Sequence, residues 1–93
     1  MIVFDRAAFD AATAGDRELQ REVLALFRGQ VAGWRVAFAG EDWRTAVHTL
    51  KGSARGIGLP ALAQACAAAE EAGAEGLAGV EQELARALAA LDQ

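Results

Sequence analysis

The chain has 93 residues, a formal net charge of −4 and a composition rich in alanine, with no tyrosine and a single proline, Pro60. This length fits one domain spanning residues 1–93, and the acidic charge argues against nucleic acid as the main partner, because binding to a phosphate backbone needs a basic surface. Abundant alanine and leucine favour helix over strand, so the predicted fold class is all-α.

The single cysteine, Cys66, allows no internal disulfide, which makes the cytoplasm the simplest predicted location. It lies among alanines, where a cysteine usually behaves as a small buried hydrophobic residue and not as a reactive thiol. Residues 1–6 lack the basic start and long apolar stretch of a signal peptide, and no window approaches the roughly 20 apolar residues that span a membrane. We therefore expect a soluble protein with no membrane partner.

Two helices are predicted in the first part of the chain. A short one covers residues 5–14 with Asp5 as its N-cap, and a longer one begins after Asp16, a good N-cap because its carboxylate accepts unpaired backbone N–H groups, and runs to about residue 39. The expected apolar stripe of the longer helix recurs at helical spacing. It comprises Leu19, Val23, Leu26, Phe27, Val31, Trp34 and Phe38.

Three further helices are predicted over about residues 42–58, 59–72 and 74–91. Gly58 suits a left-handed residue at the end of the first, and Pro60 loses no hydrogen bond in the first turn of the second. Their apolar stripes are Trp43, Val47, Leu50, Ala54 and Ile57, then Leu62, Ala65, Cys66 and Ala69, then Leu77, Val80, Leu84, Ala87 and Leu91. Short connections predict an antiparallel up-down four-helix bundle with a short additional N-terminal helix.

The third predicted helix carries a polar cluster. At roughly 100° per residue, His48 shares one flank with Arg44, Lys51 and Arg55, at i−4, i+3 and i+7. Three cations favour the neutral, nucleophilic imidazole, and they would stabilise the negative charge of a phosphorylated histidine. Gly52, at i+4, leaves room for a second protein. A lone histidine on a helix flank is otherwise an ordinary solvated residue.

The sequence HTLKGSARGIG, residues 48–58, resembles the signature of histidine-containing phosphotransfer domains. That signature is His, any residue, Leu, Lys, Gly and a small residue, with a further Gly about ten residues after the His. The resemblance continues through Leu62, Cys66 and Glu70 and covers about residues 24–73. A Lys-Gly pair at this spacing from a helical histidine is otherwise unusual, because helix interiors avoid glycine.

The resemblance implies roles for individual residues. His48 would be phosphorylated on a ring nitrogen, and Lys51 would steady the phosphoryl group. Gly52 would leave space for the active site of the partner, while Ser53 would have a weaker, positional role. Glu70 would lie near enough to orient the imidazole, and the alternative for it is an ordinary exposed carboxylate.

The resemblance also implies a function. The chain would be a phosphorelay intermediate that accepts a phosphoryl group from the receiver domain of a hybrid histidine kinase and passes it to a response regulator. The receiver domains would supply Mg²⁺ and most catalytic groups, so the chain is expected to be a carrier and not an enzyme, with no cofactor and no metal of its own. A complete bundle predicts a monomer.

Two alternatives remain open at this point. The first is a helical adaptor that binds a receiver domain or a histidine kinase without carrying phosphate. The second is a dimerisation and phosphoacceptor module of a histidine kinase, which is disfavoured because such modules are joined to an ATP-binding domain and the sequence has no nucleotide motif.

Two glycines inside the second helix, Gly29 and Gly33, each cost about 1 kcal/mol relative to alanine. Close packing against another helix is the favoured explanation. Antiparallel packing would also bring this stretch near His48, so we hypothesise that it forms part of a docking face for the partner.

Overall fold

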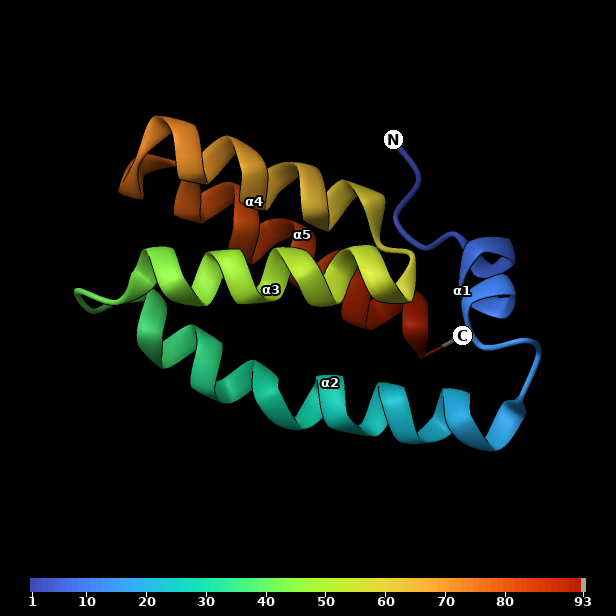
Figure 1. The fold of residues 1–93 in the computed structure, drawn as a ribbon. Helices are drawn as coiled ribbons and strands as arrows, with labels where there is room; N and C mark the ends of the chain where they lie inside the picture. The colour runs from blue at the N-terminus through green and yellow to red at the C-terminus, as the bar shows by residue number, and fades with distance from the viewer. Residues whose placement is uncertain (93) are drawn as a thin grey trace.

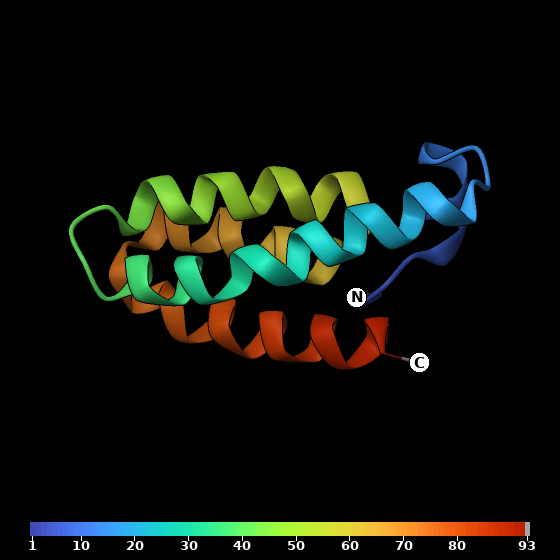
Figure 2. The ribbon, with the colours of Figure 1, turned by 90° about the horizontal axis from the view of Figure 1, so that it is seen from below.

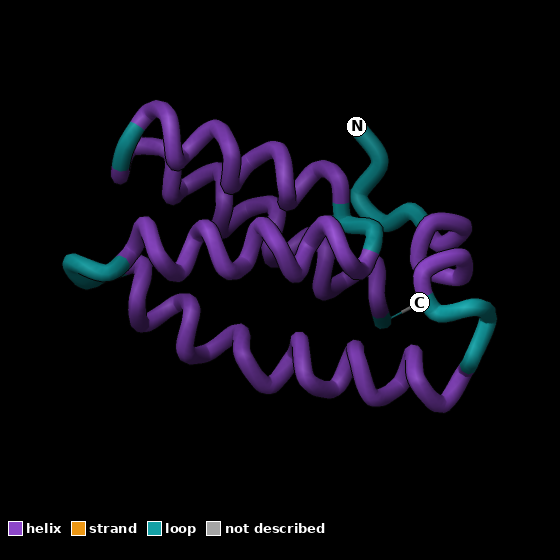
Figure 3. Tube along the Cα trace, in the orientation of Figure 1, coloured by secondary structure: helices purple, strands orange, loops and turns teal. Residues whose placement is uncertain are grey.

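Within residues 1–92, which the computed structural model describes, the chain forms five α-helices and one short 3-10 helix. They are α1 (Arg6–Ala12), α2 (Arg17–Phe38), α3 (Trp43–Ile57), α4 (Pro60–Ala72), η1 (Ala74–Gly76) and α5 (Leu77–Leu91). Helices α2 to α5 alternate in direction (Figure 1), and short loops join them (Figure 3). The predicted all-α class and the antiparallel four-helix bundle with a short N-terminal helix are confirmed.

Helix α3 lies between α2 and α4, and its most extensive packing is against α4 (Figure 1). Helix α5 packs mainly on α4 and closes the bundle against α2. Seen at 90° to that view, α3 and α5 lie on opposite sides of α2 (Figure 2). The short helix α1 covers the end of the bundle where α3 finishes. The middle of α3 is thus supported from both sides, while its outer face remains uncovered.

One hydrophobic core joins the helices, and most of the predicted stripes supply it. Its largest fully buried side chains include Phe9 of α1, Phe27 of α2, Leu50 of α3, Leu62 of α4 and Leu84 of α5.

Two core predictions for α2 are wrong, because Leu19 and Leu26 are 40% and 66% exposed. Leu26 is rotated by about 100° from its neighbour Phe27, so only one of the two can point at the core. Leu19, seven residues before Leu26, lies on the same outer flank.

The helix ends follow local capping chemistry. The Asp16 carboxylate accepts two backbone N–H groups in the first turn of α2, at 3.0 and 3.1 Å, and the Asp5 carboxylate accepts one in α1. Asp42 occupies the N-cap position of α3, but its side chain makes no capping hydrogen bond. Gly58 ends α3 in the left-handed region with φ of 88°, and Pro60 begins α4, as predicted.

A buried polar network that periodicity did not predict joins α1 to α2. The side-chain amide of Gln20 donates to Asp10 Oδ1 and to Thr13 Oγ1, both at 2.8 Å, and Arg17 donates to Gln20 Oε1 at 2.9 Å. Because each buried polar group in this network finds a partner, the network fixes the turn between the two helices at little desolvation cost.

Cys66 is fully buried in α4, as predicted. Burial raises the pKa of its thiol to about 11, and the nearby Glu70 carboxylate adds to the shift. The thiol is therefore protonated at neutral pH and shielded from solvent, which excludes the thiolate that nucleophilic or redox chemistry needs.

Candidate functional site

His48 lies in the middle of α3 on the outer face of the helix. Val47 and Leu50, on the opposite face, have no exposed surface and anchor the helix in the core. The side chain of His48 is 72% exposed. The helix thus presents this imidazole to solvent from a rigid support.

Glu70 reaches His48 from α4. Its Oε2 lies 3.2 Å from Nδ1 of the imidazole. An ionised carboxylate can only accept, so in the neutral ring this contact places the proton on Nδ1 and leaves the lone pair on Nε2. Within residues 1–92, Nε2 has no hydrogen-bond partner. Nε2 is therefore the nucleophilic nitrogen of this exposed side chain.

The same carboxylate pairs with Lys51, whose Nζ lies 2.5 Å from the other oxygen, Oε1. Lys51 is only 15% exposed and Glu70 26%, so both charged groups are largely withdrawn from water. The Lys51 ammonium lowers the pKa of the Glu70 carboxyl; burial opposes this effect, and the imidazole of His48 adds to it. Glu70 is thus an ionised bridge between two side chains of α3.

Arg44 acts on the backbone of Glu70. Its guanidinium donates a 2.7 Å hydrogen bond to the Glu70 carbonyl oxygen and lies over the ring of Trp43, with 4.6 Å between the guanidinium carbon and the ring centroid. That carbonyl belongs to the last turn of α4, where helical partners run out and a cation is favourable. Arg44 therefore holds the end of α4 against the start of α3.

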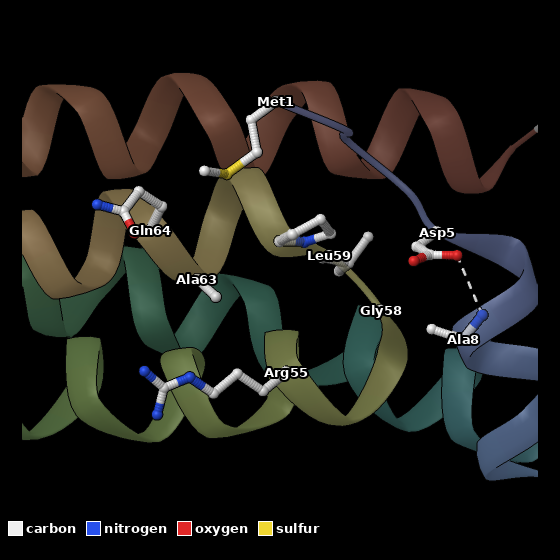
Figure 4. Close-up of a pocket in the computed structure, with 9 residues that line it drawn as sticks. Met1, Asp5, Ala8, Arg55, Gly58, Leu59, Ala63 and Gln64 are labelled. Atoms are coloured by element: carbon white, nitrogen blue, oxygen red, sulfur yellow. Dashed lines mark hydrogen bonds between the residues drawn. The ribbon is translucent and has the colours of Figure 1, made fainter.

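The structure adds two observations to the predicted cationic flank of His48. Arg55, at i+7, lies about 10 Å from His48 along the helix axis. It lines a separate open pocket of about 380 Å³ with Asp5, Gly58 and Gln64 (Figure 4). Lys51, in turn, is neutralised by Glu70. The charged group in contact with the imidazole is a carboxylate, because helical spacing within α3 does not show what α4 contributes.

Gly52 lies one turn beyond His48, and the space above it is open. A Cβ atom built on Gly52 would meet no atom within 4 Å. Neither packing nor backbone conformation within this chain therefore requires glycine there, although glycine weakens a helix interior by about 1 kcal/mol relative to alanine.

The close-packing explanation for Gly29 and Gly33 is wrong. Both are exposed on α2, and a Cβ atom at either position would meet nothing within 4 Å. As at Gly52, no packing contact inside the bundle therefore requires glycine at these two positions.

An uncharged groove of about 230 Å³ runs between α2 and α3 next to this surface. Its lining residues are Val23, Leu26, Phe27, Gln30, Ser53, Gly56 and Ile57. Ser53 is half-buried there, one turn along α3 from Thr49. Leu26 and Gln30 line the groove from α2, and Gly56 and Ser53 line it from α3. Because the two helices are antiparallel, we infer that Gly33, further along α2, lies near the level of Thr49.

A family model described as the Hpt domain matches residues 18–93, which include all of α3 and α4. The chain belongs to the Hpt family. No curated protein and no solved structure was found to match it. Membership implies histidine phosphotransfer in phosphorelay signalling, in which Hpt domains act together with receiver domains. The exposed imidazole, the lysine and the open glycine of α3 are the features that fit this activity.

Residues 1–92 of the Hpt domain contain no candidate metal site and no candidate membrane-spanning helix. No three His, Cys, Asp or Glu side chains in this part of the chain converge as metal ligands would. No helix in it is long and apolar enough to cross a membrane.

Acid should weaken the Hpt fold through Glu70. Because Lys51 holds the pKa of this carboxyl below its ordinary value of 4.5 in the folded protein, ionised Glu70 favours folding. This stabilisation is complete above the ordinary value and is lost as the pH falls through the lower folded value. We expect Glu70→Gln to be less stable than the wild type at pH 7 and the difference to narrow as the pH falls below 4.5, as measured by thermal unfolding.

The control for this prediction is Glu71→Gln, which removes the same charge from an exposed position of the same helix. Its difference from the wild type should be small at every pH. A stability difference between Glu70→Gln and the wild type that stays constant as the pH falls from 7 to well below 4.5 would contradict the prediction.

Proposed function

We propose that this Hpt domain is a phosphorelay intermediate that carries the phosphoryl group on Nε2 of His48. It accepts the group from the receiver domain of a hybrid histidine kinase and passes it to a response regulator, acting as a monomer in the cytoplasm. The observation that carries this proposal is the exposed imidazole, whose Nδ1 contacts Glu70 while Nε2 has no hydrogen-bond partner within residues 1–92.

In the proposed transfer, the lone pair of Nε2 attacks the phosphorus atom of the aspartyl phosphate. The N–P bond forms as the O–P bond breaks, and the electron pair of the broken bond returns to the aspartate carboxylate. Such transfers depend on in-line positioning and charge neutralisation, which the receiver domain supplies together with its Mg²⁺. Lys51 is the cation of this chain best placed to offset the added negative charge. The chain itself is a carrier and not an enzyme.

The docking face follows from the same proposal. It comprises Gly52 and Ser53 of α3 with Leu26, Gln30 and Gly33 of α2. None of these side chains is charged, and Leu26 is an exposed large hydrophobic residue. An uncharged face that combines small residues with an exposed leucine, beside an apolar groove, suits close contact with a second protein. Arg44 has a positioning role here, and Arg55 lies outside the face.

A direct test is incubation with a phosphorylated receiver domain. The wild type should acquire an acid-labile, base-stable label, the behaviour of phosphohistidine, and His48→Gln should acquire none. Because His48 is the single histidine of the chain, such a label reports this residue. If the wild type binds the receiver and takes up no label, the helical adaptor replaces the relay as the function.

A further inference from the structure

Glu70 is held at three points, two on its carboxylate and one on its backbone. Its Oε1 pairs with the nearly buried Lys51, its Oε2 contacts Nδ1 of His48, and its own carbonyl oxygen accepts from Arg44. Two helices thus hold a negative charge against one edge of an imidazole whose other edge is exposed. A carboxylate is not needed to set the tautomer, since any acceptor of the same shape would do so. The negative charge of Glu70 beside His48 therefore needs a separate explanation.

We propose that Glu70 keeps a proton on Nδ1 of phosphorylated His48, and thereby makes the phosphohistidine a fast donor and a short-lived store. This inference rests on the proposed function. When a receiver aspartate attacks the phosphorus, the new O–P bond forms as the P–Nε2 bond breaks and its electron pair goes to Nε2. With the proton on Nδ1, the ring leaves as neutral imidazole. Without that proton it would leave as an anion, which is a much poorer leaving group.

The charges around the ring favour the protonated form. Glu70 faces it from α4 at 3.2 Å, and the phosphoryl group adds negative charge on the opposite nitrogen. From α3, the Lys51 ammonium is paired with the other oxygen of Glu70, and Arg44 is directed to the Glu70 backbone and the Trp43 ring. A contacting carboxylate stabilises a cationic ring, because opposite charges within hydrogen-bond distance attract strongly. The surroundings therefore retain the proton at a pH where free phosphohistidine loses it.

The decisive variant is Glu70→Gln. A glutamine oxygen can accept from Nδ1 in the same place, so the tautomer is kept and only the charge is removed. Phosphoramidate, a small donor that phosphorylates imidazoles directly, loads the intact chain without a protein partner. Phosphorus NMR then gives two readouts between pH 5 and pH 9: the pH midpoint of the chemical shift, which reports protonation of the ring, and the decay rate of the signal.

We expect the Glu70→Gln midpoint to lie at least about one pH unit below that of the wild type, and its phosphohistidine to decay about 10-fold more slowly at pH 8. Glu71→Gln is the matched control and should behave as the wild type. The wild-type midpoint should also lie above that of free phosphohistidine measured in the same buffer, a comparison that needs no variant.

The outcomes separate this inference from the proposed function. A label on His48 with the same midpoint and lifetime in wild type and Glu70→Gln would overturn the role of the charge and leave the relay intact. A wild-type midpoint at or below that of free phosphohistidine would overturn it as well. A wild type that takes up no label, from phosphoramidate or from a phosphorylated receiver, would overturn the proposed function and this inference with it.

Discussion

Replacing Gly52 by leucine should slow phosphotransfer between a receiver domain and His48 by about 100-fold while the fold persists. A Cβ atom at this position meets no atom of the chain within 4 Å, so a leucine side chain extends into the space in front of α3 and not into the bundle. There it would hold the receiver aspartate away from Nε2. A misplacement of about 1 Å is enough to cost two orders of magnitude in such a transfer. Single-turnover transfer kinetics measure the effect.

The stability of Gly52→Leu, measured by thermal unfolding, is the second part of this prediction. Leucine is a better helix former than glycine by somewhat less than about 1 kcal/mol, so Gly52→Leu should be slightly more stable than the wild type. A more stable protein with slower transfer cannot be explained by unfolding.

Gly79→Leu is the matched control, since Gly79 is an exposed glycine near the start of α5 where a Cβ atom also meets nothing. It should leave the transfer rate unchanged. Gly33→Leu applies the same test to the α2 side of the docking face. If Gly33→Leu folds and transfers at the wild-type rate, that stretch of α2 lies outside the face. If Gly52→Leu does so, the glycine has no docking role.

The fold could be predicted from the sequence because its elements depend on short-range rules. Caps such as Asp16, the terminator Gly58 and the starting residue Pro60 act within one turn of the chain. Apolar spacing of three and four then assigned most of the core. The spacing rule failed at Leu26. Leu26 and Phe27 are adjacent and both apolar, but only one of them can face the core, and the packing of the whole bundle determines which one does.

The candidate site was predictable in its centre and not in its surroundings. Periodicity and the family signature both selected His48, since an outward position and a local motif can be read along one helix. The partner of Lys51 could not be read in this way, because the pairing with Glu70 depends on the register between α3 and α4. Family resemblance placed Glu70 near the ring, but spacing within α3 suggested an entirely cationic neighbourhood.

Two glycines of the same motif, Gly52 and Gly58, are glycine for different physical reasons. Gly52 is free of contacts within the chain, whereas Gly58 is required by the chain itself. Gly58 has φ of 88°, and a Cβ atom there would lie 2.7 Å from the carbonyl oxygen of Asp5. Its own carbonyl oxygen accepts a 2.7 Å hydrogen bond from the Asp5 N–H. The segment before α1 therefore crosses the end of α3 at a distance that only glycine allows.

We expect Gly58→Ala to lower the free energy of unfolding by about 2–4 kcal/mol. About 1–2 kcal/mol of this comes from a Cβ atom in the left-handed region, and the rest from displacing the Asp5 backbone and weakening its hydrogen bond. For a domain of this size the midpoint of thermal unfolding should fall by roughly 10–20 °C. Gly79→Ala, the same substitution at an exposed position in the first turn of α5, should instead stabilise the protein, by up to about 1 kcal/mol.

Gly58→Asn separates the two causes, because asparagine tolerates the left-handed region better than alanine but still carries a Cβ atom. If the contact with Asp5 dominates, Gly58→Asn should remain well below the wild type in stability. Full recovery in Gly58→Asn would assign the whole effect to backbone conformation. His48 lies ten residues earlier, about 15 Å along α3, so whichever variant is folded at the assay temperature should still transfer phosphate at the wild-type rate. Unchanged transfer would show that Gly58 serves the fold and not the reaction. We expect the opposite for Gly52, which lies one turn from the histidine.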